Sequence, residues 1–172
     1  MTKLGVSGFI VVTFLAALGA LLIPRPAAPE PHAPAAALQG CDWQAEWHGT
    51  LGELGEDPAA WSLADSAELE GNAGVAWMDT LTVLVSRDVP CRYLGDVIRH
   101  EWMHLQQGRM HGGWGAYEHY GARLEIVADC GSWLLGSAYT PYRDDARTVA
   151  FGCTMQDLAD ARELIRFRST DG

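Results

Sequence analysis

The most regular pattern of apolar and polar positions lies between residues 90 and 107. Spacings of three and four residues place six side chains on one broad face of a helix: Leu94, Val97, Ile98, Glu101, His104 and Leu105. Asp88 and Pro90 are typical of a helix start, with an acidic cap and a proline in the first turn. Gly108 is typical of a helix end. The pattern therefore predicts a helix from Pro90 to Gln107.

Alternating apolar and polar residues upstream of this helix predict a small sheet. Gly71–Gly74 is a turn signal, and Val75–Trp77 and Leu81–Ser86 are typical of strands. The pattern leaves open which strand lies at the edge of the sheet. Trp43 and Trp47 are four residues apart, so a short helix would place both on one face. This pair is more typical of core packing than of a carbohydrate-binding platform.

Helical patterns dominate the C-terminal half of the chain. The glycine-rich stretch 112–115 predicts a flexible connection, and a second helix is expected from Ala116 to Leu135. Thr140 and Pro141 resemble another helix start. A final amphipathic helix is predicted from Thr154 to Arg168, opened by a capping box. These elements together predict an α+β domain that is mostly helical with a small sheet.

The N-terminal segment has a different composition from the rest of the chain. Leu4–Ile23 is apolar and uncharged, and it is long enough to span a bilayer as a helix. We interpret residues 1–23 as a signal anchor in preference to a cleaved signal peptide. Residues 24–40 are rich in proline and alanine and predict a semi-rigid linker. Residues 41–172 would then form an extracytoplasmic domain, secreted or membrane-anchored through the N-terminal helix.

Charge excludes one class of partner. The 172-residue chain has a formal net charge of −10 at pH 7, and its single lysine is Lys3. Nucleic-acid binding needs clustered lysine and arginine for phosphate contacts, so nucleic acid is not expected as a partner. The apolar content of 48% and seven tryptophans are sufficient for a core.

Four cysteines lie in the predicted extracytoplasmic part: Cys41, Cys91, Cys130 and Cys153. An even number in an oxidising compartment predicts two disulfides, for which three pairings exist. We favour Cys41–Cys91 and Cys130–Cys153, because these pairs would tie each end of the domain to one of the two long helices. A thiolate metal site is the alternative, but the chain has no C-x-x-C pair to support it.

The first long helix carries the sequence His100-Glu101-Trp102-Met103-His104, an H-E-x-x-H motif. Histidines four residues apart lie on one helix face, roughly 6 Å apart along the axis. Both imidazoles can therefore reach one Zn²⁺ at about 2.0–2.1 Å. Glu101 would lie beside the metal, where it can take a proton from a zinc-bound water. The alternative is a pair of surface histidines on an amphipathic helix.

A third ligand is expected from the second helix, which offers four candidates: Glu118, His119, Glu125 and Asp129. Glu125 is the best of them. Asp129 follows it by one turn and can accept a hydrogen bond from the free ring nitrogen of a ligating histidine. His111 is a weaker alternative. Gly108 and His111 each come one residue late for the metzincin pattern H-E-x-x-H-x-x-G-x-x-H, a shift of about 100° on a helix.

Donors to a developing oxyanion are not singled out by spacing. Five side chains are possible: Tyr117, His119, Tyr120, Tyr139 and Tyr142. For each of them a structural role is the simpler interpretation.

The spacing H-E-x-x-H, about twenty residues, then E-x-x-x-D resembles the gluzincin arrangement of thermolysin-type metallopeptidases. The string from Glu125 to Cys130, following that from His100 to Gln107, resembles the neutral zinc metallopeptidases of bacteria over about residues 75–136. The resemblance implies a zincin-like fold, a Zn²⁺ cofactor and hydrolysis of a peptide or protein substrate. It also implies roles for five residues: His100, His104 and Glu125 as zinc ligands, Glu101 as general base, and Asp129 as the hydrogen-bond acceptor that orients a ligating histidine.

Two other functions are compatible with these residues. One is a catalytically inactive zincin-fold envelope protein that acts in binding or scaffolding. The other is a disulfide-stapled surface module without a metal. Glu101 argues against the first, because a purely structural metal site does not require a general base.

Overall fold

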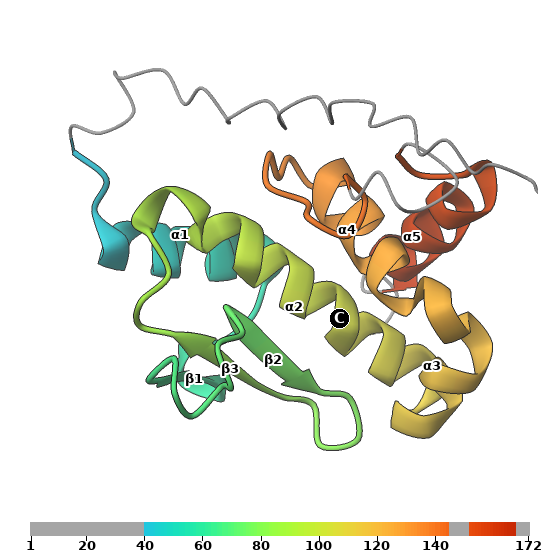
Figure 1. Cartoon of the computed structure of the whole chain (residues 1–172), viewed down its shortest axis with the longest axis horizontal. Helices are drawn as coiled ribbons and strands as arrows, with labels where there is room; N and C mark the ends of the chain where they lie inside the picture. The colour runs from blue at the N-terminus through green and yellow to red at the C-terminus, as the bar shows by residue number, and fades with distance from the viewer. Residues whose placement is uncertain (1–39, 145–151, 168–172) are drawn as a thin grey trace, which may run out of the picture. The chain divides into compact units, whose positions relative to one another are not determined.

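The computed structural model describes residues 40–144 and 152–167. Along the chain the elements are α1 (Trp43–Leu54), η2 (Pro58–Ala60), β1 (Trp61–Ala64), β2 (Gly74–Trp77), β3 (Thr82–Ser86), α2 (Cys91–His111), α3 (Gly113–Tyr120), η3 (Gly121–Arg123), α4 (Leu124–Leu134) and α5 (Met155–Phe167) (Figure 1). Helices predominate and the sheet is small, so the predicted α+β class is confirmed at this level.

Helix α2 is the element around which the others pack. It contacts α1, α3, α4, α5 and β2, and Figure 1 shows it between the sheet and the α4–α5 pair. Its buried face includes Leu94, Ile98 and Trp102, none of which has measurable exposure to solvent. Burial of such side chains contributes about 1.5–3 kcal/mol each. The histidine motif therefore lies on a helix that is held on several sides by packing against other elements.

The start of α2 was predicted to within one residue, but its predicted cap and its predicted end are wrong. Asp88 does not cap the helix, since no side chain does so and Pro90 itself is the residue before the first turn. Gly108 lies inside the helix, where a Cβ would come within 2.7 Å of the Met78 carbonyl oxygen. Glycine at 108 thus permits close packing on the β2–β3 turn. The helix ends instead at His111 and is followed by Gly112 as the C-cap, whose φ of 72° suits glycine.

The sheet has three strands in the order β1–β3–β2, so β2 is an edge strand. β1 runs parallel to β3, and β2 runs antiparallel to it with Val75 opposite Leu84. The strand predicted at Leu81–Ser86 begins one residue later, because Leu81 has a φ of 54° and belongs to the turn. β1 was not predicted.

The region after α2 differs from the prediction in two ways. The expected flexible connection at 112–115 is reduced to Gly112, because α3 begins at Gly113. The single helix expected over 116–135 is divided into α3, η3 and α4. Gly121, with a φ of 52°, changes the chain direction between α3 and α4. This break turns α4 back along α2, so that Glu125 in its first turn faces the motif histidines.

Two disulfides link the ends of the described domain to the two motif helices. Cys41 joins Cys91, the first residue of α2, and Cys130 on α4 joins Cys153 just before α5. This is the pairing favoured from the sequence, and disulfides of this kind are typical of proteins outside the cytoplasm. Trp43 and Trp47 stack with ring centroids 5.5 Å apart. Trp47 is buried in the hydrophobic core, as the packing interpretation expected.

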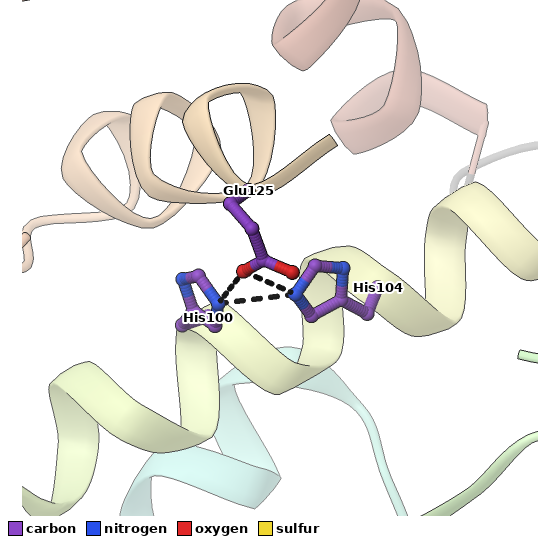
Figure 2. Close-up of side chains that lie close together, drawn as sticks. All are labelled: His100, His104 and Glu125. Atoms are coloured by element: carbon purple, nitrogen blue, oxygen red, sulfur yellow. Dashed lines mark hydrogen bonds and ion pairs between the residues drawn. The ribbon is translucent and has the colours of Figure 1, made fainter. Parts of the chain in front are cut away.

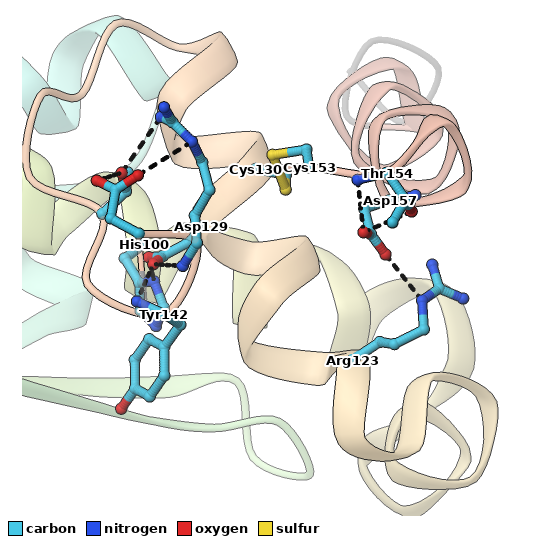
Figure 3. Close-up of a disulfide and its surroundings, with 11 residues drawn as sticks. His100, Arg123, Asp129, Cys130, Tyr142, Cys153, Thr154 and Asp157 are labelled. Carbon is cyan, nitrogen blue, oxygen red and sulfur yellow. Dashed lines mark hydrogen bonds and ion pairs between the residues drawn. A yellow bond between two sulfur atoms is a disulfide. The ribbon is translucent and has the colours of Figure 1, made fainter. Parts of the chain in front are cut away.

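Helix α5 starts with the predicted capping box. The backbone N–H of Asp157 donates to the Thr154 hydroxyl, and that of Thr154 donates to the Asp157 carboxylate. Asp157 also accepts from Arg123 at 2.8 Å, which ties η3 to α5 (Figure 3). The helix start expected at Thr140–Pro141 is a turn as far as residue 144.

Several predictions lie outside the described residues: the anchor 1–23, residues 24–39 of the linker, and the last residue of the final helix, Arg168. Within residues 40–144 and 152–167, no helix combines the length and apolar character needed to cross a membrane.

Candidate metal centre

Three potential ligand atoms converge between α2 and the start of α4 (Figure 2). The Nε2 atoms of His100 and His104 are 3.0 Å apart, and each is 3.2 Å from Oε2 of Glu125. Ligands at about 2.0–2.1 Å from a tetrahedral Zn²⁺ would be about 3.3 Å from one another. The three atoms therefore match one face of such a tetrahedron. They form the one group of this kind found among the described residues.

The outer ring nitrogens of both histidines are already engaged. Nδ1 of His100 donates to Oδ1 of Asp129 at 2.7 Å, and Nδ1 of His104 donates to Oε1 of Gln107 at 2.7 Å. In a neutral imidazole the second nitrogen then carries a lone pair. Both lone pairs point at the Glu125 carboxylate. Three electron-pair donors face one another, an arrangement that a bound cation or an added proton would satisfy.

The charges of the site agree with this demand for a cation. Burial opposes protonation of His100, but hydrogen bonds to Asp129 and Glu125 outweigh it and raise its pKa to about 10. Burial also opposes ionisation of Glu125, yet its hydrogen bonds with His100 and His104 hold its pKa well below the usual range. The carboxylate is thus kept charged beside two nitrogen donors, which suits a divalent metal.

Glu101 lies beside the three ligands rather than among them. It is 5% exposed, and burial raises its pKa, while His100 and His104 oppose that rise. Its carboxylate also accepts a hydrogen bond from the backbone of Ala76 on β2. Gly74 leaves the space that Glu101 occupies, because a Cβ there would come within 2.7 Å of Cγ and Oε1 of Glu101. A buried carboxylate with a raised pKa is suited to accept and release a proton.

A cleft passes through the site along β2. A cavity of about 200 Å³ reaches from the ligands past His104 to Tyr117 and Leu124. A second cavity, of about 440 Å³, reaches the other way to Asp96 and Tyr139. Both cavities are lined by the same central residues: Asn72, Gly74, His100, Glu101 and Tyr142. The cleft is therefore open on both sides of the candidate metal centre.

One edge of β2 faces this cleft. The Ala73 carbonyl accepts from Ser86 across the sheet, whereas the Ala76 backbone bonds to Glu101 on the other side. Because backbone groups alternate in direction along a strand, Gly74 and Ala76 direct theirs away from β3 and towards the cleft. An extended chain in the cleft would meet main-chain groups of β2 that point away from β3.

Tyr142 is held directly over one histidine. Its backbone N–H donates to Oδ2 of Asp129 at 2.6 Å, and the N–H of Arg143 donates to the same oxygen at 2.9 Å. Its ring stacks on His100 at 5.6 Å between centroids. Figure 3 shows Asp129 between the two residues it binds, His100 and Tyr142. Of the five possible oxyanion donors, Tyr142 and Tyr117 line the ligand-side cavity.

The other candidates lie apart from the ligands. Nε2 of His111 bonds to the Tyr120 hydroxyl at 3.1 Å, and its ring stacks on His119 at 4.2 Å between centroids. Burial, with a smaller contribution from Asp160, raises the pKa of Tyr120 to about 12. Glu118 accepts from the Trp114 indole at 2.9 Å. The structure brings none of these alternatives for the third ligand into the described metal group.

Gln107 is the residue that sequence reasoning missed. It has no exposure to solvent, and it joins His104 to α4 through a hydrogen bond from its Nε2 to the Leu124 carbonyl oxygen at 3.0 Å. The available signal was its position three residues after His104, which places a polar side chain on the buried side of the motif helix.

No protein-family model, curated protein or solved structure matches the chain.

Proposed function

We propose that the chain is a zinc-dependent peptidase. One observation carries the proposal: the Nε2 atoms of two histidines and a carboxylate oxygen of Glu125 converge within 3.2 Å in an open cleft, next to a buried glutamate that is not among them. Two nitrogens and one oxygen suit Zn²⁺, and three protein ligands leave the open position typical of catalytic sites. A bound Zn²⁺ would polarise a carbonyl and bring the pKa of a water near 7.

The residues around the ligands have distinct parts in this proposal. Glu101 accepts a proton from the attacking water and returns it to the leaving nitrogen. The Tyr142 hydroxyl donates to the carbonyl oxygen as negative charge develops there. The outer edge of β2 binds an extended peptide through main-chain hydrogen bonds at Gly74 and Ala76. The open cleft on both sides of Glu101 supports a chain that continues past the cleaved bond.

The wider assignment rests on the same site. We propose a zincin-like domain over residues 41–172, similar to the gluzincins and to the bacterial neutral zinc metallopeptidases. The two disulfides support a location outside the cytoplasm. A membrane anchor at 1–23, joined by the linker 24–40, and a peptide or protein substrate complete the proposal. The raised pKa of Glu101, caused by burial beside the ligands, favours an enzyme over an inactive scaffold.

Hydrolysis of casein and of a peptide library by the full chain tests this function. The zinc-loaded chain should cleave, the chelated chain should not, and added zinc should restore cleavage. The Glu101→Gln variant should keep its zinc and lose cleavage by at least about 100-fold. Retained cleavage in that variant would remove Glu101 from its role, and zinc binding without any cleavage would favour the scaffold.

A further inference from the structure

Gln107 connects a candidate ligand on one helix to the start of the helix that carries another. Its Oε1 accepts from Nδ1 of His104 at 2.7 Å, and its Nε2 donates to the Leu124 carbonyl oxygen at 3.0 Å. Leu124 is the first residue of α4 and immediately precedes Glu125. The side chain is fully buried, so both bonds are screened from water.

The amide has a fixed orientation for a chemical reason. Leu124 offers only a carbonyl oxygen, so the NH₂ group must face it and Oε1 must face His104. Oε1 accepts only, so Nδ1 of His104 carries the proton and Nε2 keeps its lone pair for the centre. Gln107 therefore selects the tautomer of His104 that can bind a metal.

Packing alone does not account for glutamine at this position. A buried amide costs free energy unless it is hydrogen-bonded, and the Gln107 side chain has no exposure to solvent. A donor from α2 to the Leu124 carbonyl thus supplies a contact that holds this turn, and Glu125 with it, at a set distance from His104.

We propose that Gln107 is a positioning residue of the metal centre, which sets the tautomer of His104 and the approach of Glu125 to it. This inference rests on the metal centre of the proposed function, but not on peptide hydrolysis. Outer hydrogen-bond partners of metal ligands typically contribute 10- to 100-fold to metal affinity. The single side chain of Gln107 makes both of the hydrogen bonds involved, one to His104 and one to Leu124.

The test compares zinc affinity and imidazole NMR signals of the full chain and two variants. Gln107→Met keeps the volume and removes both hydrogen bonds. Gln106→Met is the matched control, because Gln106 is equally buried but about 100° away around the helix. Competition with a chromophoric chelator should show zinc affinity about 10- to 100-fold lower in Gln107→Met and within about twofold of wild type in Gln106→Met.

The NMR signal separates positioning from general damage. Two slowly exchanging Nδ1–H protons, from His100 and His104, are expected in the zinc-loaded wild type. Gln107→Met should keep only that of His100. Unchanged affinity together with both protons in that variant would overturn the inference. If the variant does not fold, Gln107→Glu takes its place: it retains an acceptor and should retain the His104 proton, and loss of that proton would overturn the inference. Failure of the wild type to bind zinc would instead reject the proposed function.

Discussion

Replacing Asp129 by asparagine should disable a metal ligand that the substitution does not touch directly. The Asp129 carboxylate is fully buried and accepts from Nδ1 of His100 on one oxygen and from two backbone N–H groups, those of Tyr142 and Arg143, on the other. Asparagine offers one oxygen and one NH₂ group. In the asparagine variant, the NH₂ group must therefore point either at the Nδ1–H group of His100 or at the two backbone N–H groups, and both of these are donors.

The magnitudes decide which side loses. A hydrogen bond to a charged group is worth about 1.5–3 kcal/mol. An amide oxygen turned to the backbone keeps two bonds and gives up one, whereas the opposite orientation gives up two, at about 3–6 kcal/mol. The NH₂ group should therefore face His100, which moves the proton of that imidazole to Nε2 and removes its lone pair from the centre. Zinc affinity should fall about 10- to 100-fold.

Chelator competition on the full chain measures this effect. The matched control is Asp96→Asn, since Asp96 also accepts a loop N–H, that of Tyr139, at 2.9 Å, whereas the described hydrogen bonds of the two motif histidines go to other side chains. Asp96→Asn should bind zinc within about threefold of wild type, less than the loss expected for an outer partner. Equal affinities in Asp129→Asn and wild type would refute the reasoning from tautomers.

Three further predictions concern protonation, the general base and the cleft. Burial opposes protonation of His100, but the neighbouring carboxylates raise its pKa from 6.5 to about 10. The metal-free chain should therefore lose stability as the pH rises from 6.5 through 10. Urea unfolding in the presence of a chelator should show this dependence on pH, and His100→Gln should reduce it. Gly74→Ala should displace Glu101 and lower hydrolysis by at least about 10-fold, with zinc affinity unchanged. The control Gly49→Ala, where a Cβ meets nothing within 4 Å, should leave hydrolysis and zinc affinity unchanged. Normal hydrolysis in Gly74→Ala would contradict the placement of Glu101 as the base. Tyr142→Phe should lower kcat about 100-fold with little change in KM, and an unchanged kcat would exclude the hydroxyl as a donor.

Local patterns predicted the features that depend on local spacing. The three- and four-residue period of α2 placed Glu101 and His104 on the buried face, with His100 one turn before His104, because that period is a property of the helix alone. The capping box of α5 was likewise predicted from the sequence, since its two partners are three residues apart. Glu125 was chosen by its spacing from Asp129, and the structure brings its carboxylate to the two histidines.

Features that depend on distant contacts were missed or misread. Gly108 carries the sequence signal of a helix end, but it meets the backbone of Met78 about thirty residues earlier in the chain, and its role is close packing. β1 is four residues long and, within the part of the chain that the structure describes, pairs with β3 alone, so its own sequence contains little of the reason that it is a strand. The role of Gln107 has no local signal, because it depends on a hydrogen bond to Leu124 at the start of α4, 17 residues later in the chain.

X-ray absorption at the zinc edge of the full chain tests the central claim most directly. The account predicts one tightly held zinc with two imidazole nitrogens and a carboxylate oxygen at about 2.0–2.1 Å, plus a further light atom at the open position. In Glu125→Gln the spectrum should change or the zinc should be lost. A chain that retains no zinc, or one whose spectrum is the same in wild type, His104→Ala and Glu125→Gln, would contradict the assignment of these residues as a metal centre.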